Sequence, residues 1–141
     1  MEWTNKNAVI YAQVNTDRQM KHWNWIKSQQ TLCWMYAKSK WINVVESFQD
    51  WWKSWRDGLN QMIEYIKFRN KSDKVIDYLI IEDIDRLCWS MKEWFEIQNV
   101  FERECNVEII SLNQNFGNEP EARMMIQIAL TIKFEYHGMN K

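Results

Sequence analysis

Four short apolar runs, each rich in β-branched residues, alternate along the chain with longer amphipathic segments. The runs cover residues 8–14, 42–48, 75–83 and 107–114, and the amphipathic segments cover residues 19–39, 57–70, 90–104 and 119–136. Strands that alternate with helices are typical of crossover connections and of a parallel sheet. We therefore expect one α/β domain over residues 1–141, with a four-stranded, mostly parallel sheet covered by helices.

Two of the expected helices carry start signals. Ser90 is a suitable N-cap with Glu93 three residues later, and Pro120 suits the first position of the last helix. That last helix is apolar on nearly every face, whereas a surface helix needs one apolar stripe. It is either a central core helix or a helix that continues into a partner, and the pattern alone does not separate the two.

Charge and cysteine usage narrow the possible functions. The formal net charge is −1 although Lys and Arg number 18, so no overall basic field indicates a nucleic-acid partner. The three cysteines, Cys33, Cys88 and Cys105, are widely spaced, which is typical of a reduced, cytoplasmic chain. The first residues are polar and no stretch reaches membrane-spanning length, so we expect a cytoplasmic protein without a signal peptide or membrane contact.

Polar residues follow three of the expected strands. Asn15 and Gln19 follow the first strand, Arg56 follows the second, and Asp85 and Arg86 follow the third. Because ligands gather beyond the carboxyl ends of strands in open α/β sheets, these residues could form a phosphate clamp. The alternative is a surface ion-pair cluster, such as Asp85 with Arg56, and spacing alone favours this alternative.

Other kinds of site have weaker signals. No glycine-rich phosphate loop is present, and His22 and His137 have no partner at zinc-ligand spacing, so we expect no cofactor and no metal. The chain has 10 tryptophans against 3 glycines and 1 proline. Tryptophans can stack on bases, but these fall on turns and helix starts rather than along one strand face.

Several motifs together resemble one family. "VIYAQVNTDRQ" resembles the Y-A-R-V-S-T-x-x-Q opening of serine recombinase catalytic domains, the resolvase/invertase family. "RDGLNQMIEYI" is similar to its R-x-G-L segment, and "DIDRL" to its D-R-L-x-R motif. "EIISLNQNF" and "EPEARMMIQIAL" resemble its fourth strand and the start of its long dimerisation helix. The motifs occur in the family's order and cover nearly the whole chain.

The resemblance implies site-specific DNA strand exchange. In this family a serine hydroxyl attacks the DNA phosphate, arginines stabilise the developing charge without a metal, and dimers pair into tetramers. It implies DNA as a partner and a homodimer or tetramer formed through Met124, Ile128 and Ile132. The family's long helix leads to a separate DNA-binding domain. Here we expect that helix to be truncated and no DNA-binding domain to follow, so sequence-specific binding by the chain alone is not expected.

When the family motifs are compared with this sequence position by position, several of the catalytic positions differ. The nucleophilic serine falls on Asn15, the arginine before it on Gln13, and the second arginine of D-R-L-x-R on Trp89. Four family residues are retained: Gln19, Arg56, Asp85 and Arg86. An amide cannot replace the nucleophile, so we expect a recombinase catalytic domain that is inactive as written.

Three competing hypotheses remain open. The first is a non-enzymatic remnant that pairs with an intact recombinase, the second a single-strand binder that uses its aromatic residues, and the third a small-molecule enzyme. Tryptophan also stands at positions where the family usually has glycine, namely Trp41, Trp51, Trp52 and Trp55. One first-base change converts GGA, AGA or CGA into TGA, so a genetic code that reads TGA as tryptophan would explain these residues. Tryptophan codons written as TGG throughout the gene would contradict this hypothesis.

Overall fold

The four strands form a single parallel sheet. The computed structural model describes residues 6–14, 19–51, 56–114 and 132, without the side chains of residues 19–23. Its strands are β1 (Asn7–Val14), β2 (Asn43–Trp51), β3 (Tyr78–Ile81) and β4 (Glu108–Ser111). They pair in the order β2-β1-β3-β4, and every pair is parallel. The predicted α/β class and parallel sheet are therefore confirmed.

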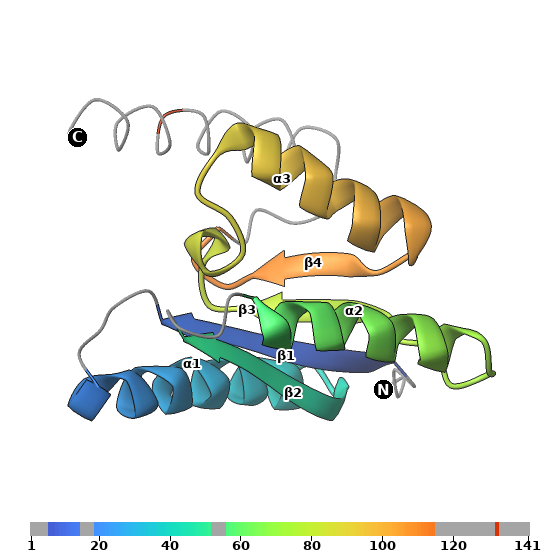
Figure 1. The fold of residues 1–141 in the computed structure, drawn as a ribbon. Coiled ribbons are helices and arrows are strands. Elements are labelled where there is room, and N and C mark those ends of the chain that lie inside the picture. Colours follow the sequence, from blue (N-terminus) through green and yellow to red (C-terminus); the bar gives the residue numbers. More distant parts are fainter. Residues whose placement is uncertain (1–5, 15–18, 52–55, 115–131, 133–141) are drawn as a thin grey trace.

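Helices cover both faces of the sheet (Figure 1). The described helices are α1 (Gln19–Ser39), α2 (Asp57–Asn70) and α3 (Met91–Gln98), with a 3₁₀ turn η1 (Ile84–Arg86) and a π-helical turn η2 (Asn99–Glu104). Alternate residues of β1 face opposite sides. Ala8 and Ile10 pack with α1, while Val9 and Tyr11 pack with α2, α3 and η2. This double burial explains why residues 8–14 are almost uniformly apolar.

Two predicted strands are shorter in the structure, and one predicted helix changes type. The runs 75–83 and 107–114 contain strands of four residues each. Strand β3 stops early because Asp83 turns back to cap η1 by accepting from the Asp85 N–H. The predicted helix 90–104 is α-helical only to Gln98, after which Cys105 N donates to Val100 O across a wider turn.

Helix α3 begins as the sequence predicts. The Ser90 Oγ accepts a hydrogen bond from the Glu93 N–H at 3.1 Å, and the Glu93 carboxylate lies 3.4 Å from the Trp89 N–H. This resembles a capping box, except that the Glu93 carboxylate reaches the N–H of Trp89, one residue before the N-cap Ser90. It fixes the position of the Glu93 carboxylate beside the loop that follows β3.

Helix α1 ends in a left-handed residue. Trp41 has φ of 60°, and the N–H groups of Trp41 and Ile42 donate to the carbonyls of Lys38 and Ala37. This hydrogen-bond pair is the Schellman motif, whose left-handed position usually holds glycine. Trp41 therefore occupies a backbone conformation that favours glycine.

The predicted last helix lies outside the described residues except for Ile132, which is helical and 65% exposed. Met124 and Ile128 are not described. Among the described residues, no helix is long and apolar enough to cross a membrane. The three cysteines are buried and not disulfide-bonded.

Candidate active site at the carboxyl edge of the sheet

A buried carboxylate joins β1, β2 and the start of α2. Asp50 is 2% exposed and lies near the end of β2. Its two oxygens accept hydrogen bonds from the Gly58 N–H at 2.7 Å and the Leu59 N–H at 2.9 Å. The Tyr11 hydroxyl donates to the same carboxylate at 2.6 Å. Asp50 therefore satisfies free backbone donors at the positive end of α2 and fixes that end against the sheet.

The environment of Tyr11 keeps its hydroxyl protonated. Burial raises the pKa of Tyr11 above its ordinary value, and the hydrogen bond to the charged Asp50 raises it further. The Arg56 side chain acts in the opposite direction and lowers this pKa, with a smaller effect. Tyr11 is therefore a permanent donor to Asp50 near neutral pH, which makes this contact a fixed part of the site.

Arg56 occupies the residue before α2 in a left-handed conformation, with φ of 70°. Its Nη2 lies 3.6 Å from Glu93 Oε2, and its guanidinium carbon lies 4.8 Å from the centre of the Trp89 ring. The Nη1 atom is buried and has no hydrogen-bond partner among the described residues. A non-glycine residue with positive φ costs roughly 1–3 kcal/mol, and such strain is common at functional sites.

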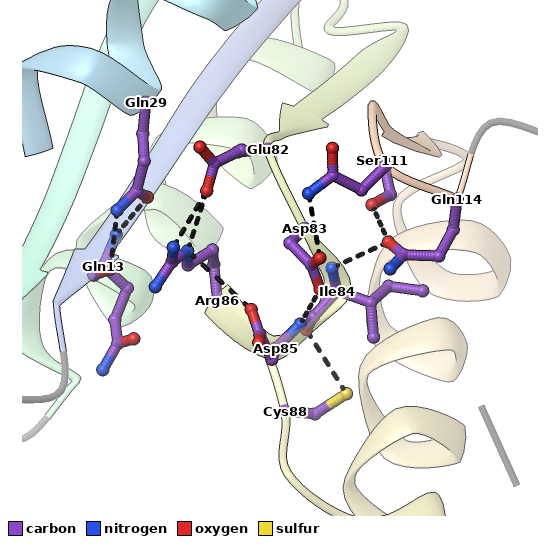
Figure 2. A network of polar contacts seen from close by, with 11 residues as sticks. Gln13, Gln29, Glu82, Asp83, Ile84, Asp85, Arg86, Cys88, Ser111 and Gln114 are labelled. Atoms are coloured by element: carbon purple, nitrogen blue, oxygen red, sulfur yellow. Dashed lines mark hydrogen bonds and ion pairs between the residues drawn. The ribbon is translucent and has the colours of Figure 1, made fainter. Parts of the chain in front are cut away.

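The second arginine of the site, Arg86, is held more tightly. Its Nε and Nη2 donate to the same oxygen of Glu82, at 3.2 and 2.9 Å. Its Nε also lies 3.8 Å from Asp85 Oδ1. These contacts fix the guanidinium on the turn that directly follows β3 (Figure 2).

The turn that carries Arg86 is itself supported from β4. Asn113 donates to Asp83 at 3.0 Å, and the Gln114 carbonyl oxygen accepts from the Ile84 N–H at 3.1 Å. Gln114 also accepts from the Ser111 hydroxyl. Figure 2 shows this chain of contacts running from the end of β4 to η1. The side chains of Asn113 and Gln114, which follow β4, therefore hold the loop after β3 in place.

Gln13 lies at the end of β1 and is fixed by α1. Its backbone N–H and C=O both bond to the side-chain amide of Gln29, at 3.0 and 2.9 Å. The Gln13 side chain is 4% exposed, and its carbonyl oxygen has no hydrogen-bond partner among the described residues. By strand alternation it lies on the same face of β1 as Tyr11, which is the α2 face. A neutral amide thus occupies the position that the resemblance gives to an arginine.

The structure brings several predicted site residues together. Arg56 and Trp89 are in contact, and Asp85 lies beside Arg86. Asn15 lies outside the described residues, and only the backbone of Gln19 is described, as the first residue of α1.

Four residues of the site were not predicted, and they are Tyr11, Asp50, Glu82 and Glu93. Tyr11 and Asp50 look like ordinary strand residues in the sequence, because a strand pattern does not indicate which polar residue will meet a helix N-terminus. Glu93 was predicted only as a helix cap. Among the described residues, no group of three His, Cys, Asp or Glu side chains is placed to hold a metal ion.

Known proteins with the same fold identify the chain. The family model described as "Resolvase, N terminal domain" matches residues 8–137. The C-terminal catalytic domain of ISC1926 TnpA, an IS607-like serine recombinase, is 26% identical, with a TM-score of 0.61 over 86% of this chain and 79% of that one. A resolvase family site-specific recombinase from Streptococcus pneumoniae is 16% identical, with a TM-score of 0.72 over 96% and 91% of the two chains.

A third solved structure agrees. The N-terminal catalytic domain of TP901-1 integrase is 21% identical, with a TM-score of 0.69 over 96% of this chain and 100% of that one. No curated protein sequence matches. The fold and these matches define the class as a serine recombinase catalytic domain. The chain belongs to the resolvase N-terminal domain family. Members of this family bind DNA and form dimers or tetramers.

Proposed function

We propose that this site-specific recombinase catalytic domain retains the phosphate-binding part of its active site but lacks the nucleophile. The observation that supports this most directly is the position of Arg56 and Arg86 on the loops that follow β2 and β3 at the carboxyl edge of a parallel sheet, with Arg56 in contact with Trp89 of the second loop. Guanidinium groups match phosphate oxygens in charge and geometry. A DNA phosphate is the ligand that the family leads us to expect there.

The nucleophile position is the reason to propose inactivity. In the family reaction, the serine hydroxyl gives up its proton as its oxygen forms a bond to phosphorus, the phosphorus–oxygen bond to the 3′ side breaks, and the departing 3′ oxygen takes up a proton. The side-chain amide of Asn15 has no hydroxyl to make that bond. Gln13 and Trp89 stand where the family has arginines, so the transition state also loses about 3 kcal/mol of stabilisation for each phosphate clamp that is lost.

Assembly and location belong to the same proposal. We place the partner interface on Met124, Ile128 and Ile132, and the protein in the cytoplasm as a single catalytic domain over residues 1–141. Gln19 and Asp85 complete the proposed phosphate site, with no cofactor. Asn15 also favours a second candidate function, in which the chain is a remnant that pairs with an intact recombinase and disables its tetramer.

A repaired variant tests the enzymatic proposal. Asn15→Ser, Gln13→Arg and Trp89→Arg would be combined, and both chains would be fused to a known DNA-binding module. Each would be incubated with a supercoiled substrate that carries paired sites, and denatured products would be analysed for protein covalently attached to DNA. We expect an adduct from the repaired chain only. An adduct from neither, with both chains folded, would contradict the enzymatic proposal and favour the remnant, which co-purification with an intact recombinase would then test.

A further inference from the structure

The two arginines of the proposed phosphate site differ in how firmly this chain's own carboxylates hold them. Arg86 makes two hydrogen bonds to one oxygen of Glu82. Arg56 reaches Glu93 Oε2 through one ion pair at 3.6 Å, with the two side chains 23% and 40% exposed. A long, partly exposed ion pair contributes little to stability and is easily exchanged for another partner. Arg56 is thus the more readily released of the two guanidiniums.

The guanidinium of Arg56 has hydrogen-bonding capacity that the described residues do not use. Its Nη1 is buried without a hydrogen-bond partner among the described residues, so one donor of the guanidinium is unused. The ring of Trp89 lies 4.8 Å from the guanidinium carbon and supports one face of it. Glu93 is the carboxylate that accompanies this guanidinium, and it approaches the other terminal nitrogen. A phosphate that binds Arg56 would meet the negative charge of Glu93 directly.

We infer that Glu93 is a resident counter-ion that competes with DNA phosphate for Arg56 and so sets the phosphate affinity of the site. This inference rests on the proposed function, because it assigns a role at the same phosphate site. Glu93 is a positioning residue and not a catalytic one. Its carboxylate has two tasks at once, since the same side chain lies beside the Trp89 N–H in the cap of α3.

The capping box supplies a variant that separates these two tasks. Glutamine serves as well as glutamate at the third position of a capping box. Glu93→Gln therefore keeps the α3 cap while it removes the negative charge from Arg56. Glu96 lies one turn later on α3 and is exposed, so Glu96→Gln gives the same change of net charge away from Arg56.

The experiment measures binding of a fluorescently labelled short DNA duplex to the full chain by anisotropy at low salt. We expect Glu93→Gln to bind about two- to fivefold more tightly than the natural chain, the effect of removing one exposed competing charge. Its dependence of log K on log salt should steepen by up to about 0.9, equivalent to one added phosphate contact. Glu96→Gln should change the affinity far less. Adding Arg56→Gln to Glu93→Gln should remove the gain.

The contrary results are distinct. An equal gain from Glu93→Gln and Glu96→Gln would show a general charge effect and overturn the inference. A gain that survives Arg56→Gln would also overturn it. If the variants bind no better than a natural chain that binds measurably, the inference fails while the proposed phosphate site stands. If no variant binds DNA at low salt, the inference and the proposed site fail together. Far-ultraviolet circular dichroism would confirm that every variant is folded.

Discussion

The Tyr11 hydroxyl donates a 2.6 Å hydrogen bond to the Asp50 carboxylate, which joins the ends of β1 and β2 beneath the first turn of α2. The same carboxylate accepts from two backbone N–H groups of that turn. Arg56 immediately precedes α2, so its position depends on where this turn is fixed. The position of Arg56 is therefore supported by the buried carboxylate of Asp50, six residues earlier in the chain, which Tyr11 of β1 holds in place.

Asp50→Asn should destabilise the fold by about 2–3 kcal/mol. Hydrogen bonds to a charged group contribute roughly 1.5–3 kcal/mol, and an amide presents only one acceptor oxygen where Asp50 uses two. Urea unfolding followed by circular dichroism would measure the change. Asp57→Asn is the control, because Asp57 is exposed in the same helical turn and its loss should cost less than about 1 kcal/mol. Similar costs for the two variants would contradict the role given to Asp50.

Gly58→Ala tests how closely α2 approaches β2. A Cβ built at Gly58 would lie 2.1 Å from the Gln49 carbonyl oxygen, which belongs to the backbone and cannot move aside cheaply. Helix propensity alone predicts that alanine stabilises a helix by about 1 kcal/mol relative to glycine. We expect the opposite sign, a loss of about 2 kcal/mol or more, because overpacking shifts the helix. If urea unfolding showed Gly58→Ala to be more stable, α2 would have enough space at β2 to accept the added methyl group, which would contradict the close approach.

Trp41→Gly should stabilise the chain by about 1 kcal/mol. The left-handed conformation at the end of α1 strains a residue with a Cβ, and glycine adopts it without that strain. Trp41 is 48% exposed, so the packing that its side chain gives up offsets part of the gain from relieved strain. Thermal or urea unfolding would measure the gain. Asn106→Gly is the control at another left-handed position, where the gain should be smaller because asparagine tolerates this conformation. A loss of stability in Trp41→Gly would contradict the strain.

Stability should fall in alkaline solution because two acids are neutral in the fold. Burial raises the pKa of the Cys33 thiol from 9.0 to about 12, and burial with the Asp50 contact raises the pKa of Tyr11 above 10.0. The folded state keeps these protons after the unfolded chain has released them. The contribution of these two groups to the free energy of unfolding is therefore complete below about pH 9. It is lost as the pH rises toward their pKa values in the folded state.

Each such group should lower the free energy of unfolding by about 1.4 kcal/mol per pH unit in this range. Urea unfolding at a series of pH values from neutral to about pH 11 would give the slope. Cys33→Ala should reduce this slope by the contribution of one titrating group. At neutral pH the variant should lose only the stability that comes from the packing of the thiol. An unchanged slope in Cys33→Ala would contradict the buried thiol as a source of the loss.

The sequence by itself determined the class of fold and the class of protein. β-Branched runs that alternate with amphipathic segments require a parallel sheet covered by helices, because parallel strands need long crossovers and bury both faces. Local signals were also sufficient for the cap at Ser90 and for the loops that carry Arg56 and Arg86. These features depend on residues close together in the chain or on motifs in a fixed order.

Only the tertiary structure decided which side chains meet. The pairing of Arg56 with Glu93 and of Asp50 with Tyr11 follows from the order β2-β1-β3-β4 and from how each loop turns over the sheet edge, whereas Arg86 and Glu82 are only four residues apart. The length of β3 also became known only in the structure, where Asp83 accepts from the Asp85 N–H and ends the strand. Side-chain partners depend on the distance between loops, and distance is a property of the folded chain that spacing in sequence does not record.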